Sequence, residues 1–139
     1  MINEINSNNG LLDIDDYVEF INPTSAPVNI SGWSFVDATG NGPTPRPRFT
    51  WPAGTIVQPG EIIAVDTMGT TPDAGTSEFP FGLGSSDSVF LHNAADAIVD
   101  MYTWTAHVTS VGRCPGATAF TAMVQTYALA NVCGDGGTL

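Results

Sequence analysis

The chain has 139 residues, of which 42% are hydrophobic and only 12% are charged, so it suits one domain with a single buried core and a surface of Asn, Thr, Ser and Gly. Three arginines and no lysine stand against fourteen carboxylates, and the formal net charge of −11 excludes nucleic-acid partners because such a surface repels phosphates. No apolar stretch is long enough to span a bilayer, which excludes membrane insertion. The negative charge makes cations or a basic protein the complementary partners.

The strand predicted over residues 16–22 is the stretch around which the fold is organised. Its side chains alternate, so that Val18 and Phe20 share one face while Glu19 lies on the other. Pro23 removes the next backbone donor and ends the strand. We expect this strand to form the nucleus of the core together with the segment that follows it.

That next segment, residues 28–35, continues with the same period of two. Gly32 turns the chain there, and Trp33 is expected to insert into the core. Further along, Pro59 and Gly60 occupy the two positions that a type II turn prefers.

Short strands separated by turn residues recur along the whole chain. Their spacing of roughly eight to twelve residues, without helical periodicity, indicates an all-β sandwich. A long polar loop is predicted over residues 67–77. The other predicted strands cover residues 2–6, 49–52, 56–57, 61–66 and 79–83, and a hairpin of residues 88–92 and 97–102.

The two cysteines predict a disulfide and an oxidising compartment. Cys114 and Cys133 stand near the C-terminus of a lysine-free chain, and closing a loop of about twenty residues contributes roughly 3 kcal/mol. A metal pair is the weaker alternative, because CxxC spacing and neighbouring histidines are absent. We assign residues 1–133 to the folded domain and residues 134–139, which are rich in Gly, to a flexible tail or linker.

Eight short motifs occur in an order and spacing typical of one family. They are INEI at 2–5, DYVEFIN at 16–22, ISGWSF at 30–35, TIVQPGE at 55–61, GLG at 82–84, DSVFL at 87–91, IVD at 98–100 and SVGR at 110–113. Together they resemble the lamin-tail domain, in the form found on bacterial secreted and surface proteins. The resemblance runs from residue 2 to about residue 131.

The resemblance implies an immunoglobulin-like sandwich that serves as a monomeric, non-catalytic accessory or adhesion module. Such modules bind protein partners outside the cell, at its surface or in the periplasm, through a sandwich edge or a loop. Arg113 would be the motif arginine, and the disulfide would hold the turn where Cys114 replaces the family's usual Pro-Asp-Gly. The DNA binding of eukaryotic lamin tails does not transfer to a chain with three arginines and no lysine.

One acidic cluster offers a calcium alternative. Asp13, Asp15, Asp16 and Glu19 place hard oxygen ligands at short spacing, although the spacing excludes an EF-hand. Within the family pattern, Asp16 and Glu19 are instead expected to accept hydrogen bonds from the backbone or from Arg113. The prediction is a protein without a required cofactor, with Ca²⁺-dependent adhesion as the alternative.

Candidate catalytic groups are few, and no nucleophile–base motif accompanies them. His92 is expected on the surface of a strand, and His107 stands alone. Asp87, Asp96 and Asp100 could act as an acid–base pair of a hydrolase, but turns and strands of ordinary sandwiches carry such residues. The sequence therefore predicts a protein that is not an enzyme.

Two tryptophans suggest a carbohydrate-binding alternative. If exposed, the indole faces of Trp51 and Trp104 would stack on sugar rings. This alternative requires at least one of the two side chains to be accessible to solvent.

Overall fold

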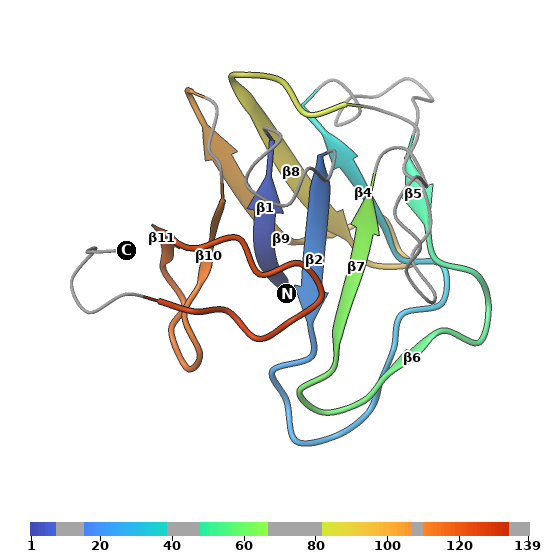
Figure 1. Cartoon of the computed structure of the whole chain (residues 1–139). Coiled ribbons are helices and arrows are strands. Elements are labelled where there is room, and N and C mark those ends of the chain that lie inside the picture. The colour runs from blue at the N-terminus through green and yellow to red at the C-terminus, as the bar shows by residue number, and fades with distance from the viewer. Residues whose placement is uncertain (8–15, 39–47, 67–81, 107–109, 134–139) are drawn as a thin grey trace.

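Two antiparallel β-sheets lie against each other in the computed structural model of the chain (Figure 1). The structure describes residues 1–7, 16–38, 48–66, 82–106 and 110–133. None of these residues belongs to a helix that could cross a membrane. The predicted all-β sandwich is confirmed.

The first sheet has five strands in the order β11-β10-β1-β2-β7. Its strands are β1 (Ile2–Asn6), β2 (Tyr17–Ile21), β7 (Ile62–Asp66), β10 (Val111–Arg113) and β11 (Phe120–Ala122). β2 is the strand predicted over residues 16–22, and β7 the one predicted over residues 61–66. The interior position of β2, between the central strand β1 and the edge strand β7, agrees with its expected role in the nucleus of the core.

The second sheet has four strands in the order β5-β4-β8-β9, and a two-stranded ribbon joins β3 to β6. These strands are β3 (Val28–Asn29), β4 (Ser34–Asp37), β5 (Phe49–Thr50), β6 (Ile56–Val57), β8 (Asp87–His92) and β9 (Ile98–Trp104). The predicted hairpin is confirmed as β8 and β9. The predicted loop at 67–77 and most of the predicted strand at 79–83 lie outside the described residues.

Aromatic side chains fill the space between the sheets. The ring of Phe20 lies 5.0 Å from that of Phe35 and 4.9 Å from that of Trp51, in tilted and edge-to-face contacts. Val18 is fully buried beside them, as the alternation along β2 predicts. The strand's other face, with Tyr17 and Glu19, is also fully buried, which the alternation alone does not explain.

A segment from the C-terminal end covers that second face. Residues 123–133, named here the C-terminal strap, pass in front of β1 and β2 in Figure 1. Tyr127 of the strap meets Tyr17 edge-on, with ring centroids 4.9 Å apart. The predicted disulfide between Cys114 and Cys133 is confirmed and closes the loop that contains the strap. The tail predicted at 134–139 lies outside the described residues.

An ion pair joins the two sheets. The Arg113 guanidinium on β10 pairs with the Asp100 carboxylate on β9, and its Nη2 lies 3.0 Å from Oδ1. Arg113 also donates to the backbone oxygens of Ile2 and Thr118, at 2.7 Å each. Burial opposes ionisation of Asp100, but hydrogen bonds from Arg113 and from the Ile2 N–H outweigh it and hold the Asp100 pKa below its ordinary value.

The glycine of the SVGR motif stands where no side chain fits. A Cβ at Gly112 would lie 2.3 Å from the backbone oxygen of Asn3, and 3.0 Å from both the amide nitrogen of Asn131 and the sulfur of Met123. A contact at 2.3 Å with backbone cannot relax by a rotamer change. β10 therefore pairs closely with β1 only because position 112 is glycine.

We expect Gly112→Ala to lower the free energy of unfolding by about 1–3 kcal/mol or more, because β10 must move away from β1. Denaturant unfolding measures the change. Gly82→Ala is the matched control, since a Cβ there meets its nearest atom at 3.8 Å. Equal stability of Gly112→Ala and the wild type would contradict the close approach.

Removing the disulfide should also destabilise the fold. Replacing Cys114 and Cys133 by serine opens a loop with a sequence separation of 19, which costs about 3 kcal/mol by loop entropy. Unfolding curves with and without a dithiol reductant test this expectation. The free energy of unfolding of the serine variant should not change with the reductant, and that of the reduced wild type should fall to about the value of the variant. A wild type whose free energy of unfolding is unchanged after complete reduction would contradict the expectation.

Candidate functional site

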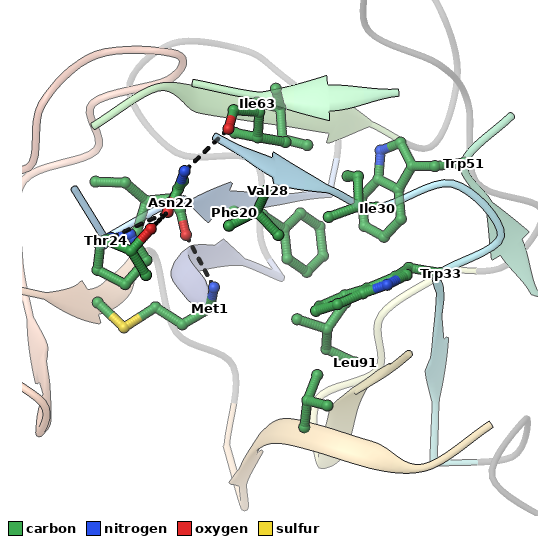
Figure 2. A pocket seen from close by; sticks show the side chains of 14 residues that line it. Met1, Phe20, Asn22, Thr24, Val28, Ile30, Trp33, Trp51, Ile63 and Leu91 are labelled. Carbon is green, nitrogen blue, oxygen red and sulfur yellow. Dashed lines mark hydrogen bonds between the residues drawn. The ribbon is translucent and has the colours of Figure 1, made fainter. Parts of the chain in front are cut away.

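An apolar cavity of about 250 Å³ opens beside the turn that follows β2 (Figure 2). Among the described residues that line it, Asn22 and Thr24 contribute polar side chains, and the only titratable group is the N-terminal amino group of Met1. Both sheets contribute to its wall. Its main apolar side chains are Phe20, Val28, Ile30, Trp33, Ile63 and Leu91.

The buried side chain of Asn22 shapes the rim of this cavity. Its Nδ2 donates to the backbone oxygens of Ala26 and Val57, at 2.8 and 2.9 Å. Its Oδ1 accepts from the N–H and the hydroxyl of Thr24, at 3.0 and 2.7 Å. All of its hydrogen-bonding groups are thus used to fix the Asn-Pro turn. The rim is therefore held in place before any ligand arrives.

The three tryptophans are placed differently from the sequence prediction. Trp51 and Trp104 are only 6% and 4% exposed, so the prediction of exposed sugar-binding platforms is wrong. Trp104 instead donates its indole N–H to the Gly84 oxygen at 3.0 Å. Trp33, expected in the core, is half-buried and lines the cavity with Trp51 (Figure 2). Residue 33 follows the turn at Gly32, where φ is +75°, and this turn places the indole at the end of the sandwich.

A second chemically unusual place lies beneath the C-terminal strap. Glu4 and Glu19 are opposite each other on β1 and β2, and both are completely buried. Glu4 accepts hydrogen bonds from the Tyr17 hydroxyl at 2.6 Å and from the Ser110 hydroxyl. Thr126 of the strap donates its N–H to Glu4 at 3.1 Å and its hydroxyl at 2.6 Å.

Glu19 shares this polar cluster. It accepts from the amide of Asn3 at 3.2 Å and from the N–H of Ala128 in the strap. Burial and the neighbouring charge of Glu4 raise the pKa of Glu19 to about 8. Burial and the same neighbour also raise the pKa of the Tyr17 hydroxyl. The Glu19 carboxyl therefore favours its protonated form at neutral pH.

The predicted calcium ligands are not brought together among the described residues. Asp13 and Asp15 lie outside these residues. Asp16 accepts the Leu83 N–H at 2.7 Å, whereas Glu19 points beneath the strap from the opposite face of β2. No group of three or more metal-ligating side chains occurs in the part of the chain that the structure describes. The expected backbone hydrogen bonds of Asp16 and Glu19 are confirmed, while Arg113 pairs with Asp100 instead.

The candidate catalytic residues serve separate structural roles. His92 is 6% exposed, so its predicted surface position is wrong, and its Nδ1 lies 3.2 Å from Asp96. Asp96 also pairs with Arg48 at 3.0 Å. Asp100 belongs to the ion pair between the sheets, and His107 lies outside the described residues.

Asp87 stands at the far end of the same hairpin. It lies opposite Trp104, whereas Asp100 lies opposite Leu91. Its carboxylate accepts the backbone N–H groups of Ala38 and Gly84, at 3.0 and 2.9 Å. The three aspartates therefore do not form an acid–base pair in this structure.

Sequence reasoning did not single out Glu4, Ser110 or Thr126. The sequence feature that could have indicated this cluster is a glutamate within each of the first two predicted strands, Glu4 at 2–6 and Glu19 at 16–22. Because a sandwich strand commonly has one solvated face, such acids are ordinarily assigned to the surface. Only the strap, which comes from the far end of the chain, buries them.

Comparison with known families agrees with this architecture. The family described as the Lamin Tail Domain, an immunoglobulin-like β-sandwich, matches residues 1–106. No curated protein matches the chain significantly. The matched region includes every strand from β1 to β9, whereas β10, β11 and the strap follow it. The chain therefore belongs to the lamin tail domain family.

Proposed function

We propose that this domain is a non-catalytic interaction module of a secreted or cell-surface protein, in the manner of the bacterial forms of its family. The observation that carries the proposal is the apolar cavity beside β2, which is open to solvent and has a preformed rim. The disulfide supports an oxidising location, because thiols of cytosolic proteins are kept reduced.

The cavity suits one large apolar side chain of a protein partner. Its volume of about 250 Å³ exceeds that of an engineered cavity, about 150 Å³, that holds benzene. Val99 lines the cavity and is 45% exposed, and the neighbouring Ile98 and Met101 on β9 are 48% and 46% exposed. An inserted anchor would thus meet the exposed apolar side chain of Val99 at the edge of the cavity, on a strand that exposes further apolar residues.

The charge of the chain indicates the rest of the partner. With a net charge of −11 and no lysine, the domain attracts a positively charged surface and repels acidic ones. We infer a basic protein segment that carries an apolar anchor residue. Binding would weaken as salt concentration rises, because salt screens the attraction between the acidic domain and a basic partner.

The positions of the acidic residues support a role without catalysis. Asp87 caps backbone N–H groups, Asp96 pairs with Arg48, and Asp100 pairs with Arg113. Among the described residues, the cavity walls carry no acidic side chain, histidine or cysteine, and their one titratable group, the Met1 amino group, donates to the Ile21 oxygen at 2.8 Å. Such a lining favours the binding of an apolar group over catalysis.

Peptide display tests this proposal and does not require the partner to be identified first. Selection of random peptides on the wild-type domain should enrich peptides that combine a large apolar residue with several basic ones. Val28→Trp, which fills the cavity mouth, should weaken their binding at least tenfold, since the anchor loses its site. Ile56→Trp is the matched control, because Ile56 is 51% exposed and lies outside the cavity lining.

The affinities of the selected peptides for the wild type and the two variants are measured by fluorescence anisotropy. Peptides that bind Val28→Trp as tightly as the wild type would contradict the cavity as the site. Selected peptides without excess positive charge, or with affinity independent of salt, would contradict the inferred partner chemistry.

A further inference from the structure

The C-terminal strap turns much of its polar surface inward and several apolar side chains outward, although Met123 is buried and Tyr127 packs on Tyr17. Val124, Leu129 and Val132 are 40%, 67% and 55% exposed, whereas Thr126 and Asn131 are buried against the sheet. A covering segment held by the hydrophobic effect would show the opposite pattern. Attachment of the strap to the sheet therefore depends strongly on its hydrogen bonds.

The middle of the strap is bound to the buried carboxyl pair. Thr126 donates twice to Glu4, and two residues later the Ala128 N–H donates to Glu19. Ala128 has a φ of 58°, in the left-handed region that residues other than glycine rarely adopt. This strained conformation directs its N–H at the carboxyl. The backbone conformation of the strap thus places its donors on the carboxyl groups of Glu4 and Glu19.

The groups that face Glu19 are acidic or neutral. Glu4 lies opposite on β1, Tyr17 precedes it on β2, and Tyr127 of the strap donates to Asp66 of β7 at 3.1 Å. The ion pairs among the described residues do not include either glutamate. A second negative charge in this pair is therefore opposed by Glu4 and by burial, without a compensating cation.

We propose that the C-terminal strap is a proton-dependent cover: it closes on the sheet when the Glu4–Glu19 pair retains a proton and opens locally when both carboxyls are ionised. The disulfide between Cys114 and Cys133 keeps the open strap attached, so that opening is reversible. Opening uncovers an acidic face of the sheet, with Glu4, Glu19 and Asp66, to solvent and to basic ligands.

The direction of the effect follows from proton linkage. In the closed form, burial and the charge of Glu4 raise the pKa of Glu19 to about 8, against the opposing hydrogen bonds from Ala128 and Asn3. Opening of the strap hydrates Glu19 and moves its pKa toward the ordinary value of 4.5. Between these two values the closed form binds more protons than the open form. Closure is therefore strongest at acidic pH and weakens as pH rises toward 8, by at most about tenfold per pH unit.

Hydrogen-exchange protection factors of the strap amides test the proposal in the intact protein. Between about pH 5.5 and 8, protection at Thr126 and Ala128 should fall at least tenfold. At about pH 8 it should also be lower than protection at Leu91, a buried position on β8, because the strap opens without global unfolding. In Glu19→Gln, strap protection should not change with pH.

Glu61→Gln is the matched control, since this exposed glutamate lies outside the cluster and its variant should keep the wild-type pH dependence. Constant strap protection across the same pH range would overturn the proposal. So would protection equal to that of Leu91 at every pH, which would mean that the strap opens only when the whole domain unfolds. The wild-type measurement alone decides this, even if Glu19→Gln does not fold.

Discussion

The partly buried ion pair between Arg113 and Asp100 is the contact on which the arrangement of the two sheets depends. β9 and β10 belong to different sheets, and this pair connects them while Arg113 also holds the backbone oxygen of Ile2 on β1. Phe120 of β11 lies beneath the guanidinium, 4.3 Å from ring centroid to Cζ, and stacks on Tyr102 of β9 at 4.1 Å. One arginine side chain thus contacts β1, β9 and β11 from its place on β10, and it links the two sheets.

This completed sheet gives the domain two faces of different chemistry. Inside the sandwich, aromatic packing leaves an apolar cavity that is suited to a partner's side chain. Outside, the strap converts what would be a solvated acidic face into a buried polar cluster around Glu4 and Glu19. The strap follows the segment that the family model matches, whereas Glu4 and Glu19 lie within that segment. The two places lie on opposite faces of β2 and can act independently.

The fold was largely predictable from the sequence, while the candidate sites were not. Period-two alternation and turn residues act locally, so β2, β7 and the β8–β9 hairpin could be located from the sequence alone. Burial of a given side chain depends on distant segments: Trp51 and His92 are covered by packing that no local pattern encodes, and Glu19 is buried by residues more than a hundred positions away. The half-buried position of Trp33 likewise depends on how the sandwich ends, which spacing alone does not reveal.

A double-mutant cycle on the pair between the sheets tests this account most directly. The free energy of unfolding would be measured for the wild type, Asp100→Asn, Arg113→Met and the double variant. If the pair joins the sheets as described, Arg113→Met should cost about 3–5 kcal/mol, because it leaves the Asp100 carboxylate buried without its partner. The double variant should then be more stable than the sum of the single changes predicts, by about 1 kcal/mol or more. Costs that add within about 0.5 kcal/mol would show that the two residues act separately and would contradict the account.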